Sequence, residues 1–332
     1  MVPSKRIFEA FQRLNVLVIG DVMIDRYLTG HVDRISPEAP VPIVALDHRD
    51  NRLGGAANVA LNIKALGATP YLCSVIGDDD NADAFLHLMP HHELPVQGIL
   101  RSPRRTTTVK TRVMAGGQQL LRVDQEITRD LEEADARALL DQVRKLLDSC
   151  SIDVILFQDY NKGNLSGPVI REVIREAVKR DIPTAVDPKF NNFWTYRQVT
   201  LFKPNLKEIR AQLPGVQVER SALRRAAEQI RKKIDNRYTL ITLGEQGLYY
   251  DHDGAYEILP TQPRPIADVC GAGDTVISTV ALGLALGLDL HETALLANLA
   301  GGQVCERIGV VPVDKAQLER EFEALLNEGS EQ

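Results

Sequence analysis

Short apolar runs alternate with longer helix-type stretches along most of this chain, and that alternation restricts its fold more than any other feature. The runs typical of buried strands are residues 15–20, 71–76, 153–157, 183–186, 200–203 and 238–243. The stretches typical of helices are residues 56–66, 132–147, 168–179 and 220–234. Strands that alternate with helices of this length predict an α/β fold, with a mostly parallel sheet covered by helices on both faces.

Two segments interrupt the alternation, and neither is followed by a helix long enough for a crossover. Residues 27–53 are rich in proline yet contain the strand-type run 41–46, and residues 104–125 place β-type side chains on both sides of Gly116-Gly117. A glycine pair between two such runs is typical of a tight hairpin. We expect one domain over residues 1–332. In it, the two segments form a small antiparallel sheet that covers a ligand site as a lid.

Composition excludes several functional classes. The net charge of −6 comes without a basic block, so we expect no binding to nucleic acid or to a membrane surface. The four cysteines lie far apart with no C-x-x-C pair, which argues against structural zinc and disulfides and favours a reducing compartment. The most apolar stretch, residues 276–288, is too short to span a bilayer, and residues 1–15 lack a signal-type core. We therefore expect a cytoplasmic protein.

The segment from Asp268 to Thr275 combines two glycines and an acidic residue just before an apolar helix over residues 276–286. Gly271 and Gly273 let the backbone approach a ligand closely, and the helix start offers unpaired N–H groups at a positive dipole end. That combination suits a phosphate group. Asp274 beside it is a candidate general base, although a carboxylate in the first helical turn is also an ordinary helix-start residue.

Other nucleotide-binding motifs fail on inspection. No G-x-x-x-x-G-K-[ST] sequence occurs, which excludes a Walker-type kinase. His48-Arg49-Asp50 imitates the protein-kinase triplet, but Gly55 stands where that motif requires asparagine. The glycines near Gly271 do not form G-x-G-x-x-G, because Val276 occupies the last position, and they lie too near the carboxyl end for a first dinucleotide unit.

The remaining motifs occur in a recognisable order. Gly271-Ala-Gly-Asp274 before an apolar helix resembles the C-terminal signature of the PfkB/ribokinase carbohydrate kinases, and Gly54-Gly55-Ala-Ala-Asn58 resembles their sugar-contacting glycine motif. Gly20-Asp21, Asn205-Leu-Lys-Glu208 and Thr242-Leu-Gly244 follow the family's order. The resemblance covers residues 16–326. It implies a ribokinase-like three-layer α/β/α fold with a small β lid, and an ATP- and Mg²⁺-dependent sugar kinase.

Three further segments, residues 20–26, 34–42 and 159–163, resemble the branch of this family that phosphorylates D-glycero-β-D-manno-heptose 7-phosphate. This branch implies transfer to the anomeric C1 hydroxyl, giving the 1,7-bisphosphate, an early intermediate of ADP-heptose for lipopolysaccharide core. Some members carry a fused nucleotidyltransferase; the sequence ends at Gln332 and resembles the stand-alone form. A ribokinase or phosphofructokinase, a non-catalytic sugar-phosphate sensor and an NAD-dependent oxidoreductase are the alternatives.

The resemblance assigns roles on the sugar side. Asp274 is the expected base, and the main chain of Gly271, Ala272 and Gly273 is expected to hold the transferred phosphoryl group. The residues expected at the sugar are Asp21, Asp25, Gly54, Gly55 and Asn58. The alternative for Asp21 is a turn residue at a strand end, and for Asn58 a helix-start residue. The cations expected at the distal phosphate are Lys162 and Arg34 first, then Arg112 and Arg122, although most such residues are solvated surface.

On the nucleotide side, the resemblance implies that Asn205, Leu206, Lys207 and Glu208 act near the phosphates, with Glu208 working through Mg²⁺ and its waters. Asp187, at a predicted strand end, is a second candidate for the metal and for the substrate site, and Lys189 for a phosphate; a surface turn is the alternative. The residues expected at the base and ribose are Thr242, Gly244, Gly247, Asn298 and Gly301. Close helix packing explains the small residues 297–302 equally well.

The family's habit also implies a homodimer formed through the β lid. We expect Val109, Val113 and Leu121 to be exposed apolar positions there.

Overall fold

A central sheet organises the molecule, which a computed structural model describes over residues 4–252 and 254–330. Its strands are β1 (Asn15–Gly20), β4 (Thr69–Gly77), β5 (Ile99–Ser102), β8 (Val154–Gln158), β9 (Thr184–Asp187), β10 (Leu201–Phe202), β11 (Tyr238–Thr242), β12 (Leu248–His252) and β13 (Ala255–Leu259). The nine lie in the order β13-β12-β11-β10-β9-β8-β1-β4-β5. From β5 to β11 every neighbouring pair is parallel, and β12 and β13 are added antiparallel. The expected mostly parallel sheet is confirmed.

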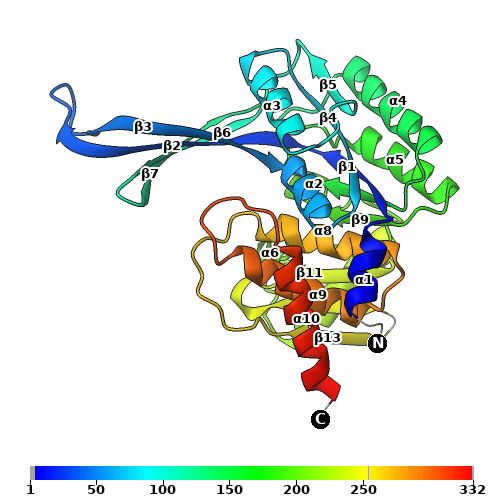
Figure 1. Cartoon of the computed structure of the whole chain (residues 1–332). Coiled ribbons are helices and arrows are strands. Elements are labelled where there is room, and N and C mark those ends of the chain that lie inside the picture. Colours follow the sequence, from blue (N-terminus) through cyan, green and yellow to red (C-terminus); the bar gives the residue numbers. More distant parts are fainter. Residues whose placement is uncertain (1–3, 253, 331–332) are drawn as a thin grey trace.

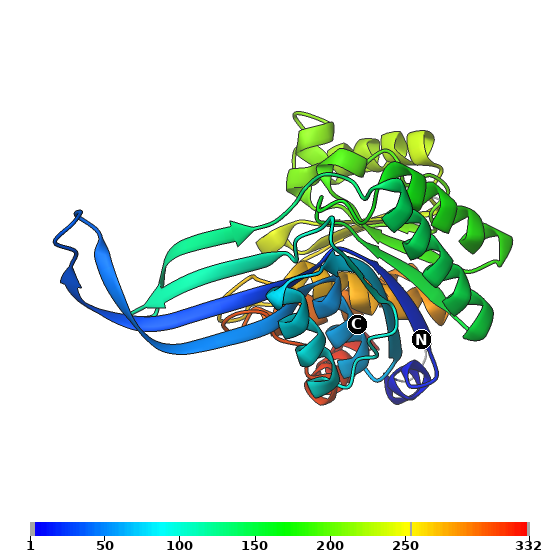
Figure 2. The same cartoon turned by 90° about the horizontal axis from the view of Figure 1, so that it is seen from above.

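Each face of this sheet has its own hydrophobic core, as β1 shows. Val16 and Val18 belong to one core, whereas Leu17 and Ile19 belong to the other, because successive side chains of a strand point to opposite faces. The first core is covered by α1 (Ser4–Phe11), α2 (Ala56–Ala65), α3 (Asp80–His91), α8 (Ala272–Ala285), α9 (Leu290–Val304) and α10 (Lys315–Ser330). The second is covered by α4 (Glu133–Ser149), α5 (Gly167–Lys179), α6 (Leu206–Gln212) and α7 (Arg220–Ile234). The result is a three-layer α/β/α body (Figures 1 and 2).

Among residues 4–252 and 254–330, none of the helices is both long and apolar enough to cross a bilayer.

A second sheet of four strands projects from the body as a long arm (Figure 1). Its strands are β2 (Val22–Ile35), β3 (Pro42–Gly55), β6 (Val109–Ala115) and β7 (Gln118–Gln125), in the order β3-β2-β6-β7. Gly116 and Gly117 join β6 to β7 with φ values of 56° and 78°, the left-handed backbone that a two-residue hairpin requires. The two segments that interrupt the alternation thus share one small sheet, and its action as a lid stays a prediction.

Three details of this arm differ from expectation. β2 and β3 have 14 residues each, far longer than the run 41–46. The pair β2–β6 is parallel rather than antiparallel, because the chain passes through α2, β4, α3 and β5 before it enters β6 from the same end as β2. Val109 is only 2% exposed, because the root of β6 packs into the first core; Val113 is half-buried and Leu121 is exposed.

Candidate active site

The carboxyl ends of three neighbouring parallel strands meet the amino end of α8. Gly20, Gln158 and Asp187 are the last residues of β1, β8 and β9, and they lie in register beside one another. Gly273, in the first turn of α8, lies so near that a Cβ placed on it would stand 3.9 Å from Oδ2 of Asp187. Ligands of parallel α/β sheets bind at the carboxyl ends of the strands, so this junction is the candidate site.

Asp274 lies buried at the centre of the junction and is surrounded by donors. Asn58 Nδ2 donates to its Oδ2 at 2.8 Å, while the Tyr160 hydroxyl and Gln158 Nε2 donate to its Oδ1 at 2.6 and 3.1 Å. Burial raises the pKa of Asp274 to about 6, although the bonds from Asn58 and Tyr160 act in the opposite direction. A carboxylate with such a pKa is ionised at neutral pH and still accepts a proton readily, as a general base must.

The glycine turn before Asp274 gives α8 its start. Gly271 has a φ of 82°, and a Cβ there would also come within 3.1 Å of Asn58 Nδ2, so the position favours glycine strongly. Ala272, Gly273 and Asp274 form the first turn of the helix, where N–H groups point outward and the dipole favours an anion. Their contact with a phosphoryl group stays a prediction.

Asp21 is placed differently from what the sequence led us to expect. It is fully buried, and both carboxylate oxygens accept hydrogen bonds from residues 160–164. This argues against the prediction that it binds sugar hydroxyls. Asn58 likewise directs its amide to Asp274, and its own Oδ1 lies 3.3 Å from Asn62 Nδ2. The structure therefore favours a role for Asn58 in holding the carboxylate.

Asp25, Gly54 and Gly55 form a second cluster, at the root of the small sheet. Oδ2 of Asp25 lies so close to Gly54 that a Cβ on the glycine would be 2.1 Å from it. Arg112 Nη1 donates to Oδ1 of Asp25 at 2.5 Å. Gly55 has a φ of 61° and caps α2, so the chain can turn there from β3 into the helix. Asp25, Gly54, Gly55 and Arg112 are thus brought together, and their contact with a sugar stays a prediction.

The cations proposed for a distal phosphate separate into two groups. Lys162 is largely buried and pairs with Glu126 at 2.8 Å; Lys110, which the sequence interpretation missed, pairs with the same carboxylate at 3.4 Å. Arg34 lies exposed near the far end of β2, roughly 30 Å along the strand from Asp25 at about 3.3 Å per residue. Arg122 is half-exposed on β7 and binds Asp124. The structure thus brings Lys162 and Arg112 to the root of the arm but not Arg34 or Arg122.

The acidic and basic side chains expected at the nucleotide phosphates form ion pairs with lysines and carboxylates of the site. Lys189 pairs with Glu208, and its ammonium group lies 5.4 Å from the centre of the Tyr160 ring. Asp187 pairs with the buried Lys203 at 3.1 Å. Burial alone would lower the pKa of Lys189, but Asp187 and Glu208 raise it on balance, so the side chain is firmly cationic.

The Asn205-Leu-Lys-Glu208 element forms a complete capping box at the start of α6. Asn205 Oδ1 accepts from the Glu208 N–H at 2.9 Å, and Glu208 Oε2 accepts from the Asn205 N–H at 2.9 Å. Lys207 is exposed, and Leu206 packs against the second core. Contact of either residue with a nucleotide stays a prediction.

The residues expected at the base and ribose lie at the end of β11, in the turn that follows it and on α9. Thr242, at the end of β11, forms an isolated parallel bridge with Asn205, and Gly244 and Gly247 turn the chain with φ values of 65° and 97°. Asn298 donates to the carbonyl of Pro260 at 2.8 Å. A Cβ on Gly301 would be 2.7 Å from Val276, which supports its alternative role in packing α9 on α8. Nucleotide contact at these five positions stays a prediction.

Metal binding by protein ligands alone is not supported. No group of three or more His, Cys, Asp or Glu side chains within residues 4–252 and 254–330 has the arrangement of a metal site. Asp187 and Glu208 each have a lysine partner. Mg²⁺ commonly uses one or two carboxylates together with water and substrate phosphates, so these two residues fit an ion that arrives with a nucleotide.

Tyr160 and Gln158 are residues of the candidate site that sequence reasoning missed. Both contact Asp274 directly. The available signal was position: they stand at and just after the end of β8, the edge at which parallel sheets bind ligands.

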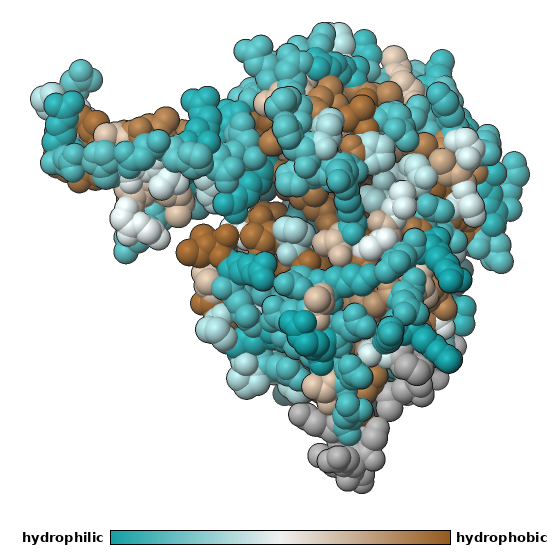
Figure 3. Space-filling view, in the orientation of Figure 1, coloured by the Kyte–Doolittle hydropathy of each residue, from teal (hydrophilic) through white to brown (hydrophobic). Residues whose placement is uncertain are grey.

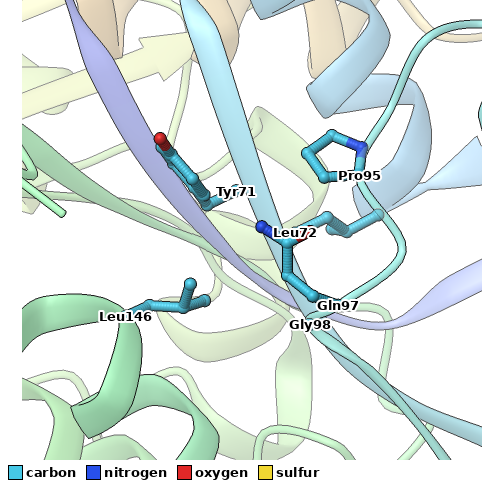
Figure 4. Close-up of a pocket in the computed structure, with 6 residues that line it drawn as sticks. All are labelled: Tyr71, Leu72, Pro95, Gln97, Gly98 and Leu146. Carbon is cyan, nitrogen blue, oxygen red and sulfur yellow. The ribbon is translucent and has the colours of Figure 1, made fainter. Parts of the chain in front are cut away.

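A small hollow elsewhere carries no such chemistry (Figure 4). It lies beside the first half of β4, has no room for a water-sized molecule, and is lined by Tyr71, Leu72, Pro95, Gln97, Gly98 and Leu146. This lining includes no charged group, so we assign it no function.

Comparison with known proteins identifies the family. The model for the pfkB family of carbohydrate kinases matches residues 13–316. This chain belongs to the pfkB carbohydrate kinase family. It is a sugar kinase, and the family expected from the sequence motifs is confirmed.

Relatives and solved structures agree with this assignment. The chain is 41% identical over 310 residues to the bifunctional protein HldE of Methylobacillus flagellatus and 39% identical over 307 residues to that of Geobacter sulfurreducens. These matches cover 93% and 92% of this chain but only 63% and 62% of the relatives' own length. Escherichia coli phosphofructokinase-2 (TM-score 0.77, 20% identity, 95% of this chain and 99% of that one) has the same fold. So does Arabidopsis thaliana ribokinase complexed with ribose and ATP (TM-score 0.71, 16% identity, 92% and 99%).

The raised pKa of Asp274 predicts an acidic limb in the pH profile. Because the base must be deprotonated, kcat/KM should fall about tenfold per pH unit below about pH 6 and level off above it. The measurement uses an uncharged sugar as acceptor, so that ionisation of a substrate phosphate does not contribute. A flat profile between pH 5 and 7 would contradict the assignment of Asp274.

Replacing the carboxylate by an amide separates catalysis from helix capping. Asp274→Asn should lower kcat by about 10²–10⁴-fold, because the proton acceptor is lost. Its melting temperature should change little, since relief from a buried charge offsets a weakened bond to Asn58. Asp289, whose side chain caps α9, is the matched control, and Asp289→Asn should leave kcat unchanged. Similar kinetics for the two variants would show that Asp274 is only a helix-start residue.

Proposed function

We propose that this chain transfers the γ-phosphoryl group of ATP to the anomeric C1 hydroxyl of D-glycero-β-D-manno-heptose 7-phosphate, in the cytoplasm. The products are heptose 1,7-bisphosphate and ADP, and the bisphosphate feeds the synthesis of ADP-heptose for lipopolysaccharide core. The sugar is suggested by the resemblance of residues 20–26, 34–42 and 159–163 to the heptose kinases and by about 40% identity to proteins named HldE.

One observation carries the reaction class: a buried carboxylate stands at the start of a helix, with one acceptor position left open. An ionised carboxylate has about four lone-pair sites. Asn58, Gln158 and Tyr160 occupy three of those on Asp274, two on Oδ1 and one on Oδ2. The remaining site is on Oδ2, which is therefore the oxygen that accepts the proton of the attacking hydroxyl.

The chemical step follows from that geometry. The C1 oxygen forms a bond to the γ-phosphorus while the bond from that phosphorus to the β–γ bridging oxygen breaks, and the hydroxyl proton moves to Asp274. Charge spreads over the equatorial oxygens, which the N–H groups at the start of α8 stabilise. The charges of Asp187, Glu208 and Asp274 raise the pKa of Lys189. Lys189 therefore supplies a fixed positive charge at the site.

Mg²⁺ fits beside Asp187 and Glu208, and when bound with ATP it neutralises phosphate charge. Both carboxylates already hold lysines, so we expect them to act on the ion chiefly through its waters.

A second cluster suits the phosphate that the sugar itself carries. Lys110 and Lys162 converge on Glu126, and Lys110 stands beside Asp25 in the register of β2 with β6. Arg112 is on the same face of β6 as Lys110, two residues away. Lys110 and Lys162 would bind a distal phosphate in place of Glu126, and Arg112, whose partner is Asp25, lies beside them at the root of the arm.

A substrate panel tests the proposal. ADP release should be fastest with the heptose 7-phosphate, and slower by at least tenfold with fructose 6-phosphate, ribose and unphosphorylated heptose. Lys162→Met should lower kcat/KM for the phosphorylated heptose by about 10–100-fold, the value of one charge-assisted bond, and leave unphosphorylated heptose unaffected. Lys145→Met, an exposed change on α4, is the control. Preference for fructose 6-phosphate or ribose would assign the chain to another kinase of the family, and binding without turnover to a sensor.

We also propose that the arm joins two copies of the chain. Val113 of β6 faces Leu121 of β7, and Thr111 faces Val123, so these side chains share one face of the sheet. Leu121 and Val123 are 57% and 52% exposed. Figure 3 shows brown, hydrophobic residues along the arm. Exposed apolar side chains on a projecting sheet are typical of an interaction surface, and a second copy of the chain would bury them.

The oligomeric state in solution tests this arm contact. Leu121→Asp should shift the protein from dimer to monomer in sedimentation velocity, because a charge would be buried at the contact. Val178 on α5 is equally exposed, and Val178→Asp should leave the dimer intact. A monomeric parent protein at micromolar concentration would contradict the proposal.

A further inference from the structure

The carboxylate of Asp21 is fully occupied by one short loop. Oδ2 accepts from the N–H groups of Tyr160 and Lys162 at 2.8 and 3.0 Å. Oδ1 accepts from the N–H and the side-chain amide of Asn164, both at 3.1 Å. These four bonds use the full acceptor capacity of a carboxylate. Asp21 is also 0% exposed, so it has neither a lone pair nor a surface to offer a ligand.

The same loop is fixed from its other side by a second buried carboxylate. Asp159 Oδ1 accepts from the Asn161 N–H at 2.8 Å, and its Oδ2 accepts from Tyr196 at 2.8 Å and Asn192 at 3.1 Å. Burial, and secondarily the charge of Asp21, raises the pKa of Asp159 to about 6. Between these carboxylates the chain turns sharply, with Asn161 at a φ of 54°. Asparagine adopts this left-handed backbone more readily than other non-glycine residues, so the residue type suits the turn.

The loop of residues 160–164 places one side-chain group, the Tyr160 hydroxyl, beside Asp274. The Tyr160 N–H is held by Asp21, and the hydroxyl of the same residue donates to Oδ1 of Asp274 at 2.6 Å. That bond helps to fill Oδ1, so that the open acceptor position falls on Oδ2. A single residue, Tyr160, therefore connects Asp21 to Asp274 through hydrogen bonds.

We infer that Asp21 is a positioning residue, which holds the loop of residues 160–164 so that the Tyr160 hydroxyl orients Asp274 with Oδ2 toward the acceptor hydroxyl. The inference rests on the proposed function in one respect, namely that Asp274 is the base. It does not depend on which sugar is phosphorylated. It replaces the role in sugar binding that the sequence suggested for Asp21.

A double-mutant cycle tests the path. Asp21→Asn keeps the size of the side chain but replaces one acceptor oxygen by NH₂, and Tyr160→Phe removes only the hydroxyl. Each should lower kcat about tenfold or more and change the KM for the sugar less than threefold. If Asp21 acts through Tyr160, the double variant should be no more than about twofold slower than Asp21→Asn alone. Losses that multiply, or a tenfold rise in KM with kcat unchanged, would overturn the inference.

Hydrogen exchange supplies a readout that does not need turnover. In Asp21→Asn the amides of residues 160–164 should exchange at least tenfold faster, while β1 and β8 keep their protection. Asp153→Asn is the matched control, because Asp153 also accepts a main-chain N–H, from Asn15 at 2.7 Å, at the opposite end of β1. It should leave both kcat and exchange in the loop unchanged, and an equal effect there would overturn the inference.

The outcomes separate this inference from the proposed function. Any sugar that the parent phosphorylates serves for the kinetics, so a different preferred sugar affects only the proposed function. If the parent phosphorylates no sugar, the proposed function fails, while faster exchange in the loop still supports the anchoring by Asp21. If Asp21→Asn does not fold, Tyr160→Phe decides: an unchanged or increased kcat would overturn the inference.

Discussion

Burial of the Asp274 charge is the constraint on which the rest of the site depends. A carboxylate removed from water stays ionised only where donors replace the lost hydration. Here the donors come from α2, from the end of β8 and from the loop after β8. Asn58, residues 158–160 and Asp274 are far apart in the sequence, so the buried carboxylate has all its donors only when the sheet, α2 and α8 are assembled. Folding and the chemistry of the site therefore use the same contacts.

The two lysines nearby also carry charges with little exposure to water, and each has a carboxylate as its partner. Lys203 is only 2% exposed and Lys189 is largely buried, and each is paired with a carboxylate that itself has little exposure. The capping box of α6 fixes Glu208 in place, so the pair with Lys189 does not depend on a mobile side chain. Because each lysine already has an acidic partner, the proposed function leaves much of the charge on a nucleotide's phosphates to main-chain N–H groups and, when it is bound, to Mg²⁺.

Sequence patterns predicted the body better than the arm. The strand over residues 15–20 matches β1, because an uninterrupted apolar run ends at a glycine there. β3 was not predicted in full, because residues 46–52 are mostly charged, and strands with two solvated faces lack the apolar alternation that marks a strand. In the arm, the glycine pair between β6 and β7 was the one clear sequence signal, and it predicted the turn of that hairpin.

The site shows a similar limit. The position of Asp274 and the glycines at the start of α8 was predictable, because their spacing and the helix that follows define local geometry. The hydrogen-bond partners of Asp21 and Asn58 were not, because residue type gives hydrogen-bonding capacity without the direction of the side chain. Asp21 lies at a strand end, where a ligand site and a loop anchor look alike in sequence. Tyr160 contacts Asp274 across 114 positions, a pairing that no local pattern records.

Packing around α8 explains how the site keeps its dimensions. Ser278 of α8 donates to the Val59 carbonyl of α2 at 3.2 Å, and Thr275 donates to Asn62 Oδ1 at 3.0 Å, so the two helices cannot slide past each other without breaking these buried bonds. On its other side α8 packs against α9 where Gly283 and Gly301 leave room, since a Cβ on either would come within 2.7 Å of the facing side chain. Close packing of this kind resists small displacements. The 2.8 Å bond between Asn58 and Asp274 is thus set by helix contacts along α8, and in the proposed function a change in those contacts would alter catalysis by reorienting the carboxylate.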